Sequence, residues 1–355
     1  MSVYIISILA VIRIYEIINY NKGADWAKIG MRCSMEKVNI NLLVGLDTKV
    51  KLDYLNTNFK AAKVFNIKDY GKGKSSKHNL EVALATYLNK EADNKEQAIV
   101  YYAKNLNRKK RIKFYKKFKD RAKITIHFFA LDFKTCLETA LKEYKNEDKA
   151  RKALLKQYKN LQVPRLNVDC DAIKVIGDFA KYKPEFAEDI SHDSPYHHES
   201  LHTHNKLAIE LAKEDKDPAR MQEIATFHDL GKHMARIKDE TDTPAANYFR
   251  SVNNGKFYHY SKHQYISACY YLAYINEKVD LSELKDPHVQ EKLENLEVIY
   301  QHMHAHQGFS KKMIKRYKLN ETELALLNRF EKIDSAARVI DEEVLSKFLS
   351  LKQQN

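Results

Sequence analysis

The sequence is poor in residues that interrupt regular structure. Its 355 residues include only 9 glycines and 6 prolines, which predicts long helices joined by few turns. Hydrophobic residues make up 44% and charged residues 30% of the chain. This balance excludes an intrinsically disordered protein and indicates a globular one. The length is sufficient for two domains, each with its own core.

Cysteine is scarce and shows no pairing pattern. The absence of any CxxC spacing excludes a zinc knuckle and a disulfide framework, and it predicts reduced thiols in a cytoplasmic protein. The four cysteines are Cys33, Cys136, Cys170 and Cys269.

A membrane anchor is not expected either. The run Val3–Ile12 is apolar apart from Ser7 and ends at Arg13, after about ten residues, whereas a bilayer span needs about twenty. No basic segment precedes this run and no small-residue cleavage site follows it. We expect a buried strand or helix here.

Positive charge is in excess. The net charge of +14 favours a polyanionic partner, with nucleic acid first and an anionic membrane surface second. The alternative is a lysine-rich surface with no specific partner.

The first half of the chain has the pattern of an α/β domain. Apolar runs of strand length occupy Val38–Leu46, Ala98–Tyr102 and Ile124–Leu131, and the basic segment Arg108–Lys123 has helical character. Strand, basic helix and strand form a βαβ unit with parallel strands. A charged helical stretch over residues 133–160 and a connector over Val163–Pro195 follow. We predict an α/β domain over residues 1–180.

The second half is predicted to be helical and carries most of the histidines. Five polar residues each lie on the apolar stripe of their own predicted helix, by the i, i+3, i+4, i+7 rule. They are His204, His228, His263, His302 and Asp334. Several buried imidazoles and a buried carboxylate are costly unless one or two divalent cations satisfy them together. This donor set suits Mn, Ni, Fe, Zn or Mg.

The segment Phe227–Lys232 reads Phe-His-Asp-Leu-Gly-Lys. With His204 before it and Asp334 after it, the pattern resembles the HD superfamily of metal-dependent phosphohydrolases, whose hallmark is a distant His, an HDxGK doublet and a final Asp. The resemblance implies an all-α helical bundle over residues 190–350. It also implies metal ligation by His204, His228, Asp229 and Asp334. His263 and His302 match the ligands added in dinuclear members, which implies a second metal. The alternative is that these two histidines contact the phosphate directly.

The same resemblance implies roles in catalysis. Asp229 is expected to bridge the metals or orient the attacking water, and Lys232 to contact a phosphoryl oxygen as a catalytic and substrate-binding group. His197, in a Pro-Tyr-His-His loop, is expected to bind phosphate. Loop or outer positions are expected for the remaining histidines of this half that we weighed, namely His202, His233, His259, His304 and His306.

The segment Ile99–Arg111 resembles one stretch of P-loop polynucleotide kinases, and the match extends loosely over residues 75–175. Tyr102 and Lys104 stand where that family has Asp and Thr. No GxxxxGK[ST] loop is present, and the segment Gly71–Ser76 lacks its glycine spacing. We therefore expect a degenerate P-loop kinase-like domain without kinase activity.

The cationic segment of that domain suggests its use. Arg108, Lys109 and Arg111 begin a dense basic helix suited to phosphate contacts, unless it is merely a solvated surface helix. We predict a phosphohydrolase or phosphodiesterase acting on RNA ends that bear a 2′,3′-cyclic phosphate or a 2′- or 3′-phosphate. One alternative is hydrolysis of a small cyclic nucleotide or oligonucleotide signal, and another is an inactive nucleic-acid-binding protein. An RNA or nucleotide phosphoester, and no membrane, is the expected partner.

Overall fold

The computed structural model describes residues 37–46, 49–71, 75–90, 98–103, 105–131, 133–144, 146–158, 160–177, 190–281, 283 and 285–354. The run Val3–Ile12, Cys33, Lys104 and residues 72–74 lie outside these ranges. Within the described ranges, no helix is both long and apolar enough to cross a membrane.

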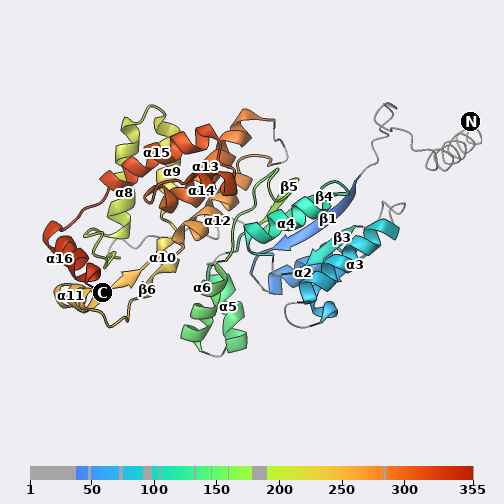
Figure 1. Ribbon diagram of the computed structural model, residues 1–355, viewed down its shortest axis with the longest axis horizontal. Helices are drawn as coiled ribbons and strands as arrows, with labels where there is room; N and C mark the ends of the chain where they lie inside the picture. The colour runs from blue at the N-terminus through green and yellow to red at the C-terminus, as the bar shows by residue number, and fades with distance from the viewer. Residues whose placement is uncertain are drawn as a thin grey trace, which may run out of the picture. The chain divides into compact units, whose positions relative to one another are not determined.

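The first half is an α/β structure (Figure 1). Its elements are β1 (Val38–Val44), α2 (Lys49–Asn58), β2 (Lys63–Asn66), the 3-10 helix η2 (Ile67–Tyr70), α3 (Ser76–Lys90), β3 (Ile99–Tyr102), α4 (Arg108–Phe118), β4 (Ala122–Phe129), α5 (Phe133–Tyr144), α6 (Glu147–Tyr158) and β5 (Ala172–Ile176).

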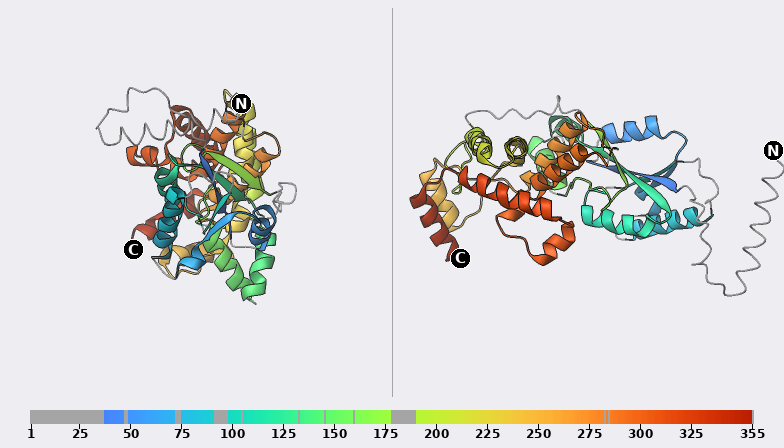
Figure 2. Two further views of the ribbon diagram at one scale, coloured as in Figure 1. Left: turned by 90° about the vertical axis from the view of Figure 1, so that its right-hand side faces the viewer. Right: turned by 90° about the horizontal axis from the view of Figure 1, so that it is seen from above.

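The strands form one five-stranded sheet in the order β2-β3-β1-β4-β5, and all neighbours are parallel. Helices cover both faces (Figure 2). Leu43 packs with Leu55 of α2 on one face, while Ile40 and Leu42 share the other core with α3 and α4. Burial on both faces explains why apolar residues dominate the strands, although β1 also contains Asn41 and β4 contains His127. The predictions of an α/β half and of its strands at β3 and β4 are confirmed, and β1 lies within the apolar run Val38–Leu46.

The predicted helical stretch over residues 133–160 is confirmed and consists of two helices, α5 and α6. One detail of the predicted first half is wrong. The connector predicted over Val163–Pro195 contains the strand β5. β5 lies at an edge of the sheet, where Lys174 is exposed and only Ile173 is fully buried. Such a short, partly polar edge strand leaves no apolar run in the sequence.

The second half is almost entirely helical, as predicted. Its elements are α8 (Leu201–Leu211), the 3-10 helix η3 (Ala212–Glu214), α9 (Pro218–His228), α10 (Lys232–Ala235), β6 (Ile237–Lys238), α11 (Pro244–Val252), β7 (Tyr258–His259), α12 (His263–Asn276), α13 (Pro287–Ala305), α14 (Lys311–Tyr317), α15 (Glu321–Ala336) and α16 (Glu342–Gln353).

Both halves belong to one compact unit, Val38–Asn355. Their buried apolar residues form a continuous cluster that includes Ile126 of the sheet and Ile299 of α13. The predicted domain boundary stays a prediction, because residues 178–189 lie outside the described ranges.

Two arginines of the predicted RNA-binding surface are buried, which corrects the sequence analysis. Arg108 is 2% exposed and binds Glu297 of α13 at 2.9 and 3.1 Å. Arg111 is 1% exposed and binds Asp169 at 2.8 Å. Both share the buried stripe of α4 with its phenylalanines, because positions three to four apart lie on one helix face. Lys109 is exposed, as predicted.

Candidate metal centre

Five helices of the second half bring the predicted ligands together. His204 comes from α8, His302 from α13 and Asp334 from α15, and all are buried. His228 is the last residue of α9, and His263 is the first residue of α12. The i, i+3, i+4, i+7 spacing therefore identified residues that do face one another across the helical core.

The end of α9 makes the adjacent His and Asp usable together. Asp229 leaves the helical conformation, with φ of −108° and ψ of 2°. Gly231 then passes so close to α12 that a Cβ atom on it would lie 2.2 Å from the carbonyl oxygen of His263. Only glycine fits this contact, so the glycine of the His-Asp-Leu-Gly-Lys segment sets the spacing between α9 and α12.

The first ligand cluster consists of His204, His228 and Asp334. Their ligand atoms all lie within 4.8 Å of one another. Asp334 Oδ1 is 3.1 Å from His204 Nε2 and 3.6 Å from His228 Nε2.

The second cluster consists of Asp229, His263 and His302, also with ligand atoms within 4.8 Å of one another. Asp229 Oδ1 is 3.0 Å from His263 Nε2 and 3.7 Å from His302 Nε2. The other oxygen, Asp229 Oδ2, faces the first cluster at 3.4 Å from His204 Nε2 and 3.3 Å from His228 Nε2. The carboxylate of Asp229 therefore joins the two clusters.

Hydrogen bonds fix the orientation of three of these imidazoles. The Nδ1 atoms of His228, His263 and His302 each lie 2.7 to 2.8 Å from a backbone carbonyl oxygen. A carbonyl only accepts, so each Nδ1 carries a hydrogen and each Nε2 faces the centre. The Nε2 atoms of His263 and His302 face each other at 3.1 Å. A divalent cation between these nitrogens and the carboxylate of Asp229 would satisfy all of them together.

Among the described residues, His228 Nε2 is a buried atom of this centre that makes no hydrogen bond. Asp229 Oδ2 makes no hydrogen bond either, but it is ion-paired with the Lys232 ammonium at 2.6 Å. A buried nitrogen that faces two carboxylates without a hydrogen bond suits a bound cation. Burial by itself would lower the pKa of His228, but the carboxylates of Asp229 and Asp334 outweigh it and raise that pKa to about 10. Burial lowers the pKa of His302 to about 4, although Asp229 opposes the change. The donor set and the position of His228 Nε2 thus fit one or two divalent cations.

Lys232 lies directly beside the two clusters. It is 6% exposed, and its ammonium is 2.6 Å from Asp229 Oδ2 and 3.1 Å from His192 Nε2. The predicted position of this lysine at the reacting centre agrees with the geometry, and its role in catalysis stays a prediction.

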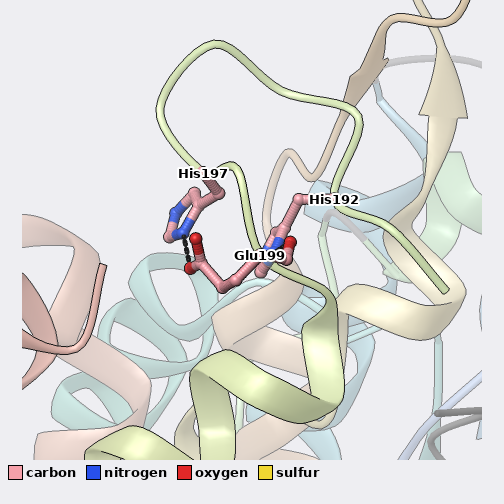
Figure 3. Close-up of side chains that lie close together, drawn as sticks. All are labelled: His192, His197 and Glu199. Atoms are coloured by element: carbon pink, nitrogen blue, oxygen red, sulfur yellow. Dashed lines mark hydrogen bonds and ion pairs between the residues drawn. The ribbon is translucent and has the colours of Figure 1, made fainter. Parts of the chain in front are cut away.

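A third group of His and Glu side chains adjoins the first cluster (Figure 3). Glu199 Oε1 accepts hydrogen bonds from His197 Nδ1 at 2.7 Å and from His204 Nδ1 at 3.2 Å. The rings of His192 and His197 stack at 4.1 Å. Parallel rings do not aim their lone pairs at one point, and the Lys232 ammonium already donates to His192. The group therefore suits a hydrogen-bonded support better than a third metal site.

The sequence analysis did not identify His192 or Glu199. For His306 it expected a loop or outer position. His306 Nε2 lies 2.7 Å from Asp334 Oδ2. His192 and Glu199 lie in a loop before α8, where no helical period marks them, and the only signal was the local density of His and Glu.

The centre opens into a cavity of about 920 Å³. Asp229, His263 and Asp334 form part of its wall, together with Lys232 and His197. Lys109 lies on α4 in the other half and is not among the residues that line this cavity.

No protein-family model matches the chain, and no curated protein sequence matches it. The functional assignment therefore depends on the chemistry of the buried His and Asp clusters.

Proposed function

We propose that the protein is a metal-dependent phosphohydrolase of the HD type that acts on RNA ends. The observation that supports this most is the carboxylate of Asp229, whose two oxygens face two buried clusters of His and Asp. A carboxylate between two such clusters is the arrangement that a pair of divalent cations needs in a phosphoester-cleaving centre. His204, His228 and Asp334 would hold one cation, and His263 and His302 the other.

The residues of this site suit phosphoester hydrolysis. Divalent cations, when bound, lower the pKa of a water ligand and polarise a phosphoryl oxygen. The ammonium of Lys232, 2.6 Å from Asp229, places a positive charge where negative charge grows on the phosphoryl group. His197 stands on the same cavity wall, where it would contact the substrate phosphate.

RNA ends are favoured as substrates by the charge of the other half. Although Arg108 and Arg111 are buried, the side chains of Lys109, Lys110 and Lys113 on α4 are exposed. Exposed lysines on one helix attract a phosphate backbone without reading its sequence. The kinase-like half would then position RNA for the hydrolytic half.

A small cyclic nucleotide or oligonucleotide is the second candidate substrate. The observation that favours it is the burial of Arg108 and Arg111, which removes two of the strongest phosphate-binding groups from the basic face. A substrate held wholly in the 920 Å³ cavity needs no contact with α4.

The test is hydrolysis of an RNA with a 2′,3′-cyclic phosphate in the presence of Mn, Ni or Mg. Wild type is compared with Asp229→Ala and with a control, Asp217→Ala. Asp217 begins the same helix but makes no side-chain capping bond. We expect phosphate removal by the wild type and the control only.

Two other results would contradict the proposal. Bound metal without turnover of the RNA would exclude the RNA-end assignment and favour cyclic nucleotides. If the protein binds none of these metals, the remaining interpretation is an inactive nucleic-acid-binding protein.

A further inference from the structure

The cavity next to the metal centre has a second, apolar wall. Phe257, Phe348, Ala245 and Ala246 line it and form a small core of their own. They come from α11, from α16 and from the strand region before β7. The cavity thus joins a polar end that suits a phosphoryl group to a wall with several apolar side chains, beside which Lys352 and His259 lie.

Tyr196 is more exposed than the phenylalanines of this wall. It lines the cavity and is 37% exposed, whereas Phe257 and Phe348 are 5% and 4% exposed. Its ring meets Phe348 edge-on at 6.0 Å, and its hydroxyl accepts a hydrogen bond from Lys352 at 3.3 Å. These contacts hold the ring while leaving much of its surface open.

Its neighbour in the sequence ties Tyr196 to the reacting centre. The next residue, His197, binds Glu199, which in turn binds the metal-ligand candidate His204. A ligand that stacks on the ring of Tyr196 would therefore contact the loop that also carries His197 and Glu199.

The cavity wall carries cations that could contact an anionic ligand. Lys262, Arg338 and Lys352 lie along this wall, while the carboxylates of Asp229 and Asp334 belong to the two ligand clusters. The carboxylate of Asp239, also on the wall, is already engaged by Thr241 and His259. Cations beside an exposed aromatic ring are the groups that bind nucleotides, which carry a phosphate and a flat base.

The size of the cavity agrees with this chemistry. Cavities for small ligands measure roughly 300–1,000 Å³, and this one measures about 920 Å³. A phosphate group alone would leave most of this volume unfilled, whereas a nucleotide would fill more of it.

We propose that Tyr196 is the stacking platform for a nucleobase, so that the substrate is recognised by its terminal nucleoside as well as by its phosphate. This inference rests on the proposed function, because it places the phosphate at the His and Asp clusters. It makes Tyr196 a specificity-determining residue.

The test is calorimetric binding of adenosine 3′-monophosphate and of 1-O-methylribose 3-phosphate, the same ligand without its base, in buffer containing Mn. The variants are Tyr196→Ala, Tyr196→Phe and the control Tyr144→Ala. Tyr144 is similarly exposed, at 40%, but belongs to α5 of the other half. Loss of one base-stacking ring weakens binding by about 5- to 150-fold.

We expect Tyr196→Ala to weaken binding of the nucleotide by that factor and to leave the base-free ligand unaffected. Tyr196→Phe and Tyr144→Ala should bind both ligands as the wild type does. Equal nucleotide affinity in wild type and Tyr196→Ala would overturn the inference, and so would equal wild-type affinity for both ligands. Nucleotide binding that depends on Tyr196, without hydrolysis of any ester, would keep this site and refute the proposed reaction.

Discussion

Glu199 is expected to control metal affinity although it is not itself a ligand candidate. Its carboxylate accepts from Nδ1 of His204 and of His197, and its second oxygen accepts from the backbone N–H of Val339 at 3.1 Å. The bond to His204 keeps the hydrogen on Nδ1 and leaves Nε2 free for a cation. In Glu199→Gln the negative charge is lost, and the amide N–H₂ must face one of these three donors.

The expected loss of metal affinity in Glu199→Gln depends on which hydrogen-bond acceptors remain near His204 Nδ1. Loss of such an outer partner lowers metal affinity by about 10- to 100-fold. His204 Nδ1 also lies 3.3 Å from the carbonyl oxygen of Ala337, which remains as an acceptor in the variant. We therefore expect a loss near tenfold, or about 1.4 kcal/mol.

The assay is competition for Mn or Ni against a chelator at fixed pH, with Glu210→Gln as the control. Glu210 lies on α8 with His204, but its side chain is 54% exposed and pairs with Lys213. Unchanged metal affinity in Glu199→Gln, with a wild type that does bind metal, would show that this carboxylate does not orient the ligand. A fall in thermal stability alone would give it a purely structural role.

Three further predictions concern stability and RNA binding. Glu297→Ala leaves Arg108 buried and unpaired, so urea denaturation should show a loss of about 3–5 kcal/mol, much of it regained when Arg108 is also replaced by Met. His127 is buried and its pKa is lowered to about 4. The unfolded chain therefore binds a proton that the folded chain does not between about pH 4 and 6.5. Folding stability should fall by on the order of 3 kcal/mol as the pH drops through this window, and His127→Gln should flatten that dependence. Replacing Lys109 and Lys113 by Ala should weaken RNA binding and reduce its salt dependence by roughly 0.7 in slope for each lost phosphate contact, without changing hydrolysis of a cyclic mononucleotide.

The ligand candidates could be predicted because they lie on regular elements. His204, His302 and Asp334 sit within helices, where an apolar stripe shows which face is buried. The strands β3 and β4 were predictable for a similar reason, since burial on both faces gives a short segment dominated by apolar side chains.

Two kinds of residue could not be predicted. Some lie in loops, which have no helical or strand periodicity, and others were assigned to the surface for their charge although their spacing placed them on a buried helix face. His192 and Glu199 occupy a loop whose path is set by single contacts, such as the bond from His198 N to Val339 O at 2.7 Å. Arg108 and Arg111 were assigned to a surface because of their charge. Their spacing to Phe114 and Phe118 placed them on the buried face, and only the partners Glu297 and Asp169, far away in the sequence, make that burial possible.

Arginines of the α/β half thus have a part in building the candidate centre. Arg108 binds Glu297 on α13, five residues before His302. Arg165 binds Glu323 on α15, the helix that carries Asp334, at 2.7 and 2.8 Å. One helix from each ligand cluster is thus held by an arginine of the sheet half, and without those arginines the two glutamates would remain as uncompensated buried charges. The α/β half would therefore support the candidate centre independently of any contact with RNA.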